Sequence, residues 1–274
     1  MTYTLGKAGA SIDELLLKAD ALYNPNILID GNFEYWDEGA SFTGGAGYTA
    51  TMWYKSADAN VGRSTTVPDN KSTYSLRLHG NNTYIAIRHF VPSVIAQQLK
   101  QNCTLSFWVR RVSADAGDTR VVIYTANVKD NFSSTTWRLG PTFTTTQDTW
   151  EKKEIVLDLN QTDIENGFFV LITGTRAVSA NVDFLFSQVK LEPGTVTTPF
   201  YQGPEERLRV FRYLEPFQVR SENGSRHVPF MEKRTTPSVV PSAGSAGNIT
   251  THGFELTHTS AASITGVANA RFYP

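Results

Sequence analysis

The chain has 274 residues, of which 12% are aromatic and 19% charged, and its formal net charge is -1. This length allows one large domain and a smaller one. The near-zero charge argues against broad attraction to nucleic acid or to an anionic membrane, because both normally need clustered Lys and Arg. No apolar run approaches the length of a membrane span, so we expect no membrane insertion.

The first 24 residues predict a helix. Ser11 and Glu14 form a capping box at its start. An apolar stripe then recurs at helical spacing through Ile12, Leu15, Ala19 and Leu22. A stripe this short is not stable alone, so it must pack either on the chain's own β-domain or against the same helix of sister chains.

The segment from Asn26 to Trp53 reads as the opening of an antiparallel β-sandwich. Ile27 to Ile29 predict a short apolar strand that ends at the Asp30-Gly31 turn. We expect the aromatic residues that follow to pack in the core rather than bind a ligand. These residues are Phe33, Trp36 and Trp53.

From Thr73 onward, alternating or continuous apolar segments predict the strands of two facing sheets. They cover residues 74–80, 83–91, 104–111, 119–128, 150–159, 167–176 and 182–192. Between them, Pro92 to Gln98 predicts a short helical turn. Gly203-Pro204 marks the best domain boundary, and residues 204–274 then predict a small β-domain of hairpins. By this interpretation, residues 1–24 are the only convincing helix.

Several blocks of the chain, in order, resemble jelly-roll domains related to carbohydrate-binding modules that occur in bacteriophage tail-fibre and appendage proteins. That family's N-L-L-x-N-G-x-F-x-x-W opening, with its Y-T-A and tryptophan continuation, corresponds here to NILIDGNFEYW and YTATMW. Its central strand is similar to CTLSFWVRR, and its closing strand and exit loop to FSQVKLEPGTVTTPF. Its C-terminal β-domain is similar to EERLRVFRYL and KRTTPSVV.

This resemblance implies a mainly β fold. We expect an antiparallel jelly-roll β-sandwich over residues 25–203, resembling a carbohydrate-binding module. A short N-terminal helix over residues 1–24 would serve oligomerisation and virion attachment. A small C-terminal β-domain over residues 204–274 would form the tip of a trimer.

The wider carbohydrate-binding family can hold a structural calcium between the glutamate after the G-x-F turn and one of two paired acids in the last strand. Glu34 stands at the first position, but Ser187-Gln188 replaces the acids. Calcium needs several converging oxygen ligands. We therefore expect no metal and no cofactor.

Catalytic motifs are absent from the sequence. It has no phosphate-binding loop, no G-x-S-x-G and no H-E-x-x-H. Paired carboxylates for glycoside cleavage need only spatial proximity, so the sequence leaves them open. Cys103 precedes apolar Leu105, which favours a buried or half-buried thiol over a nucleophile. We predict a non-enzymatic protein with no catalytic residues.

A glycan site needs exposed aromatic faces beside polar donors, because sugar rings stack through their C–H faces and bond through their hydroxyls. Trp137, which reads as part of a polar loop with Arg138, is the strongest candidate. Tyr84 and Arg88 share a face of one strand, and Tyr124 lies on another. Structural packing is the competing interpretation for each of them.

The resemblance implies a structural virion protein, a homotrimeric tail-fibre or appendage subunit that takes part in recognising host-surface glycan. Its partners would be sister copies, other virion proteins bound through the N-terminus, and the glycan. Its location would be the virion, assembled in the bacterial cytoplasm. Two other classes remain, a monomeric carbohydrate-binding module and a glycan hydrolase or esterase. A free module needs neither the N-terminal stripe nor the C-terminal β-domain, which favours the virion subunit.

Overall fold

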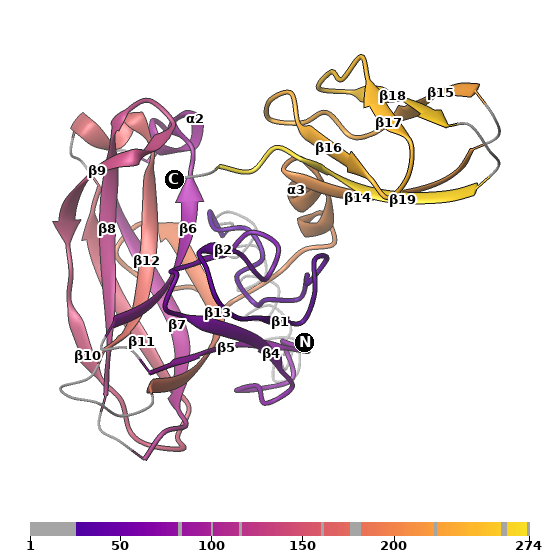
Figure 1. Ribbon diagram of the computed structural model, residues 1–274. Helices are drawn as coiled ribbons and strands as arrows, with labels where there is room; N and C mark the ends of the chain where they lie inside the picture. The colour runs from indigo at the N-terminus through magenta and orange to yellow at the C-terminus, as the bar shows by residue number, and fades with distance from the viewer. Residues whose placement is uncertain are drawn as a thin grey trace, which may run out of the picture. The chain divides into compact units, whose positions relative to one another are not determined.

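The computed structural model describes residues 26–81, 84–99, 101–114, 117–159, 162–175, 182–221, 224–258 and 262–272 (Figure 1). The predicted N-terminal helix therefore lies outside the described residues. The chain divides into two compact units between Gln202 and Gly203. This division falls one residue before the boundary that we expect between Gly203 and Pro204.

Two antiparallel sheets form the first unit in the part of it that the structure describes. Sheet I has the strand order β1-β4-β5-β13-β7-β11. Its strands are β1 (Ser41–Phe42), β4 (Asn60–Ser64), β5 (Ser75–Gly80), β7 (Asn102–Arg111), β11 (Glu151–Asp158) and β13 (Val182–Pro193).

Sheet II has the order β10-β8-β12-β6-β3-β2, and β9 also pairs with β8. Its strands are β2 (Gly47–Tyr48), β3 (Tyr54–Lys55), β6 (Tyr84–Val91), β8 (Asp118–Val128), β9 (Asn131–Leu139), β10 (Thr142–Thr144) and β12 (Phe168–Thr175). Two short helices connect strands, α2 (Ser93–Ala96) and the 3-10 helix η1 (Thr162–Asn166). Helix α2 confirms the helical turn predicted between Pro92 and Gln98.

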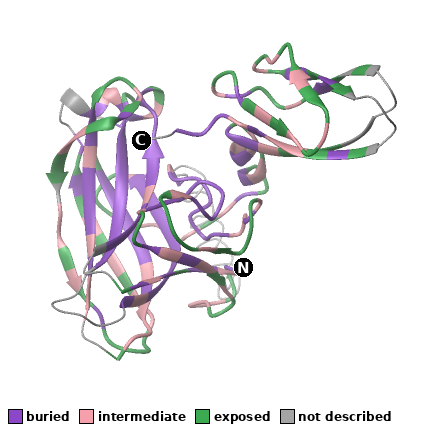
Figure 2. Cartoon of the chain, in the orientation of Figure 1, coloured by how far each residue is buried: buried purple, intermediate pink, exposed green. Residues whose placement is uncertain are grey.

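Alternating apolar residues fill the space between the two sheets, and Figure 2 shows buried residues along their strands. In β7, the fully buried residues are Cys103, Leu105, Phe107 and Val109. The ring of Phe107 lies 5.9 Å from that of Phe143 in sheet II and 6.2 Å from that of Phe186 in sheet I. The predicted antiparallel jelly-roll sandwich and mainly β fold are therefore confirmed.

The opening segment forms no strand at Ile27 to Ile29, and the prediction of one is wrong. These residues lie in bends and a turn. The Asn26 side chain makes the bonds that a strand backbone would make: its Oδ1 accepts from the Leu191 N–H at 3.0 Å. Its Nδ2 donates to Val189 O at 2.8 Å. A side chain that pairs with the backbone in this way competes with regular strand pairing.

The aromatic residues after the turn pack in the core, as predicted. Phe33 and Trp53 are fully buried and Trp36 is 8% exposed. The rings of Phe33 and Trp53 lie 5.0 Å apart, and Trp53 Nε1 donates to Asp30 O at 3.0 Å. The opening motif is therefore part of the sandwich's hydrophobic core.

Strand β9 corrects a second prediction, because residues 131–139 form a strand rather than a polar loop. They pair with β8 beyond a two-residue turn at Lys129-Asp130, where Asp130 has a φ of 55°. The segment is rich in Ser and Thr and lacks apolar alternation, so periodicity could not reveal it. The strand is stabilised by backbone hydrogen bonds to β8 rather than by burial of alternating apolar side chains.

The second unit begins with a helix that the sequence did not reveal, α3 (Glu206–Phe211). It is too short to show periodicity. Sheet III joins β14 (Leu214–Ser221), β19 (Ala262–Asn269) and β16 (Ser238–Pro241), and sheet IV joins β15 (Gly224–Pro229), β18 (Gly253–His258) and β17 (Ser245–Gly247). The buried core contains Val228, Phe254, Leu256 and Ile264. The predicted small C-terminal β-domain is confirmed.

Candidate functional site

The outward face of sheet II gathers aromatic and arginine side chains from five strands. Strand pairing places Tyr124 of β8 opposite Phe169 of β12 on one side and Trp137 of β9 on the other. It also places Arg88 of β6 opposite Tyr54 of β3. Together with Arg120 of β8, these residues form a surface that we call the aromatic face. Its members are Tyr54, Arg88, Arg120, Tyr124, Trp137 and Phe169.

The rings and guanidinium groups of the aromatic face contact one another. Tyr124 stacks on Phe169 with a centroid distance of 5.0 Å and an interplanar angle of 19°. The Arg88 guanidinium carbon lies 5.2 Å from the Tyr54 ring centroid and 5.3 Å from that of Phe169. These cation–π contacts hold the arginine across the face.

Solvent reaches this face mainly at the β9 side. Trp137 is 51% exposed, and the Arg120 guanidinium carbon lies 6.0 Å from its ring centroid. Arg88 and Tyr124 are half-buried. Their smaller neighbours on the same face, Val122 and Leu171, are buried. The accessible part of the face is therefore an aromatic surface with arginine donors beside it.

The structure brings together three of the residues expected at a glycan site, Arg88, Tyr124 and Trp137. Trp137 is exposed, although it lies on a strand and not in the loop that we expected. Tyr84 begins β6, and its side chain lies outside what the structure describes. Arg138 is separate from the others: its Nε donates at 3.3 Å to the hydroxyl of Thr125, which belongs to the core-facing side of β8. The pairing of β9 with β8 shifts register at this residue, and a shared glycan site for Arg138 and Trp137 stays a prediction.

Sequence reasoning missed Arg120, Tyr54 and Phe169. Arg120 carried a usable signal, since it lies four residues before Tyr124 on one strand and so shares its face. Phe169 lies in the apolar run of β12, which is buried on both faces, so no alternation marks it. Tyr54 belongs to a strand of only two residues, which is too short to show any period.

The residues at the expected calcium position do not fit a calcium ion. Glu34 Oε1 accepts the Thr73 N–H at 2.6 Å. Gln188 Nε2 donates to Asp69 Oδ1 at 2.6 Å, so this position offers an amide donor where the related domains have an acid. Among the described residues, no group of three acidic, histidine or cysteine side chains could hold a metal.

Cys103 is a buried thiol, as predicted. It is fully buried on the core side of β7, and burial raises the pKa of its thiol to about 11. The thiolate is the nucleophilic form. At neutral pH this side chain therefore behaves as a small apolar group.

No protein-family model and no curated protein sequence matches this chain. Among solved structures, the CBM22-1 xylan-binding domain of Paenibacillus barcinonensis Xyn10C matches with a TM-score of 0.42 and 13% identity, over 63% of this chain and 97% of that one. The enzymatically active domain of bacteriophage CBA120 tailspike protein 4 matches with a TM-score of 0.40 and 10% identity, over 61% and 21%. These are likenesses of chain path at low similarity, and they carry no functional argument.

Within the described residues, no helix combines the length and apolar character needed to cross a membrane.

Proposed function

We propose that this protein binds carbohydrate through the aromatic face of sheet II. One observation carries the proposal: the half-exposed Trp137 adjoins Tyr124 and Arg120, and Arg88 lies over Tyr54 and Phe169. Pyranose rings present C–H faces to aromatic rings, and their hydroxyls accept hydrogen bonds from guanidinium groups. The aromatic face offers both kinds of partner on adjacent strands.

The proposed role is binding without catalysis. Glycoside cleavage needs two carboxyl groups flanking the bond. Of the described residues that point outward from β6, β8 and β12, Asp118 is the single acid. The rest are aromatic, arginine, threonine or aliphatic. The composition of these three strands supports a binding surface.

The biological setting that we propose is a bacteriophage virion, in which the protein is a homotrimeric tail-fibre or appendage subunit that recognises host-surface glycan. The support for this setting is the ordered sequence resemblance, from NILIDGNFEYW to KRTTPSVV. The sister chains and other virion proteins would meet it through residues 1–24. Assembly would take place in the bacterial cytoplasm.

A panel of purified bacterial surface polysaccharides, immobilised and probed with the full chain, tests the binding proposal. We expect retention by at least one polysaccharide, and the Trp137→Ala variant to lose it. If no polysaccharide retains the full chain or its variant, the proposal is overturned. Release of reducing ends during incubation would overturn its non-enzymatic part.

Light scattering of the full chain at micromolar concentration tests the assembly separately. We expect the mass of a trimer. A monomer that still binds polysaccharide would contradict the virion subunit and favour the alternative of a monomeric carbohydrate-binding module.

A further inference from the structure

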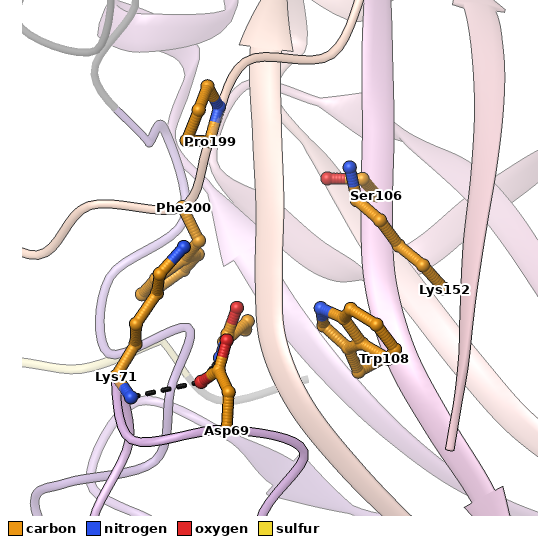
Figure 3. Close-up of a pocket in the computed structure, with 8 residues that line it drawn as sticks. Asp69, Lys71, Ser106, Trp108, Lys152, Pro199 and Phe200 are labelled. Atoms are coloured by element: carbon orange, nitrogen blue, oxygen red, sulfur yellow. Dashed lines mark hydrogen bonds between the residues drawn. The ribbon is translucent and has the colours of Figure 1, made fainter. Parts of the chain in front are cut away.

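The outward face of sheet I holds a pocket that the aromatic face does not use. Its volume is about 120 Å³ (Figure 3). Asp69, Lys71 and Phe200 lie on one side of it, and Ser106, Trp108 and Lys152 on the other. Gln188 and Pro199 complete the lining. At about 30 Å³ per water molecule, this volume matches about four waters, which is enough for one edge of a sugar ring but not for the whole ring.

A β-bulge builds the floor of the pocket. In β13, Ser187 pairs with Trp108 and Lys190 pairs with Ser106, so β13 carries one extra residue between these pairs. Gln188 lies in this bulge with a φ of 51°, a backbone conformation unusual outside glycine. The bulge turns Gln188 toward the outward face, where its Nε2 donates to Asp69 Oδ1 at 2.6 Å.

A buried ion pair fixes the wall of the pocket that contains Pro199 and Phe200. Lys190 and Glu192 are 1% and 0% exposed at their side chains, and their charged atoms lie 2.9 Å apart. Glu192 Oε1 accepts the Thr198 N–H at 2.9 Å, and Lys190 Nζ donates to Pro199 O at 3.3 Å. These bonds hold the segment after β13 against the sheet and so position Pro199 and Phe200 at the pocket.

Several polar side-chain groups line the pocket. They are the indole Nε1 of Trp108, the hydroxyl of Ser106, the ammonium of Lys71 and the carboxylate of Asp69. A molecule bound in the pocket could form hydrogen bonds with these groups in place of water.

Donors and an acceptor that converge beside two aromatic rings fit a neutral sugar. Asp69 and Lys71 carry opposite charges on the same side of the pocket, and Lys152 is paired with Glu154 at 2.5 Å, so the pocket has little net charge to attract an ion. A pyranose would stack on Trp108 and Phe200 and would offer hydroxyls to Asp69, which accepts, and to Trp108, which donates.

We propose that this pocket is a second carbohydrate site, which binds one neutral pyranose unit between Trp108, Asp69 and Lys71. It lies on the opposite sheet from the aromatic face and goes beyond the proposed function. Binding at one site does not require the other.

The indole N–H region of the NMR spectrum of the full chain separates the two sites. The chain has five Trp residues, and the Trp108→Phe variant identifies the Trp108 signal by its loss. The probes are the methyl glycosides of glucose, galactose and mannose at millimolar concentration, with methyl glucuronide as the charged comparison. We expect at least one neutral glycoside to move the Trp108 signal, whether or not the Trp137 signal also moves.

Matched variants test the polar contacts. Lys71→Ala and Asp69→Asn should each weaken binding about tenfold or more, as expected for loss of one hydrogen bond to a charged group. Lys129→Ala, at another exposed lysine of the first unit, should leave it unchanged. No shift of Trp108 with any probe, or a shift with methyl glucuronide alone, would overturn the proposal. Unchanged affinity in both pocket variants would also overturn it. A shift of the Trp137 signal reports on binding at the aromatic face and does not test the pocket.

Discussion

The two outward faces of the β-sandwich are built by the same alternation of residues but have different surroundings. On sheet II, the outward residues of β8 and β9 include Trp137, which is half exposed. On sheet I, the segment after β13 is bonded to outward residues of the strands, and the Lys190–Glu192 pair below it is almost fully buried. The comparison teaches that an outward strand position does not by itself mean an exposed surface. Where another segment covers a strand, its outward side chains stabilise the fold; where no segment covers it, they are accessible to other molecules.

The largest expected effect comes from breaking the buried pair on sheet I. Glu192→Ala leaves the Lys190 ammonium buried without its partner, and we expect a loss of about 3–5 kcal/mol in the free energy of unfolding. Glu154→Ala removes an exposed pair on the same sheet and should cost about 0–1 kcal/mol. Urea unfolding measures both. Equal losses would contradict the distinction between covered and open positions.

On sheet II, the variant Trp137→Ala should separate binding from stability. We expect about tenfold weaker polysaccharide binding, because a central aromatic contact is lost, and a change in unfolding free energy within about 0.5 kcal/mol, because the ring is exposed. Trp53→Ala, in the core, should instead cost about 3–5 kcal/mol. Val156→Ala removes another exposed apolar side chain and serves as the binding control. A large stability loss in Trp137→Ala would show that this ring is structural.

The smallest expected effect concerns Cys103 on the core side of β7. Its pKa is about 11 in the folded protein, because of burial, against an ordinary value of 9.0. Between these values the unfolded thiol has lost its proton while the folded thiol keeps it, so its contribution to stability is complete below pH 9 and falls as pH rises. The stability difference between the native chain and Cys103→Ala, followed from pH 8 to pH 11, measures this. A difference that grows with pH would contradict the assigned burial.

The sandwich could be predicted where side-chain alternation controls strand formation. In β7, the alternation of Leu105, Phe107 and Val109 with outward residues shows both the strand and its buried face. The same reasoning failed at Ile27 to Ile29, where the Asn26 side chain takes the hydrogen bonds of a neighbouring strand. It failed again at β9, where a polar sequence is held by backbone pairing with β8.

The aromatic face could be predicted only in part. Arg88, Tyr124 and Trp137 were recognisable as polar or aromatic residues on strands or between them. Their contact depends on the order of strands in sheet II, which brings β9, β8, β12 and β6 side by side from distant parts of the chain. Sequence pattern gives the face of each strand but not its neighbours. The pocket on sheet I depends on one extra residue in β13, and sequence pattern does not reveal such a bulge either.

The central claim is that the aromatic face of sheet II binds glycan. Its most direct test is to titrate the full chain with a polysaccharide fragment that it retains and to follow its indole N–H signals. We predict that the Trp137 signal moves with the titration and that the signal of buried Trp53, whose Nε1 donates to Asp30 O, stays in place. A saturable interaction that leaves the Trp137 signal unmoved would contradict this claim.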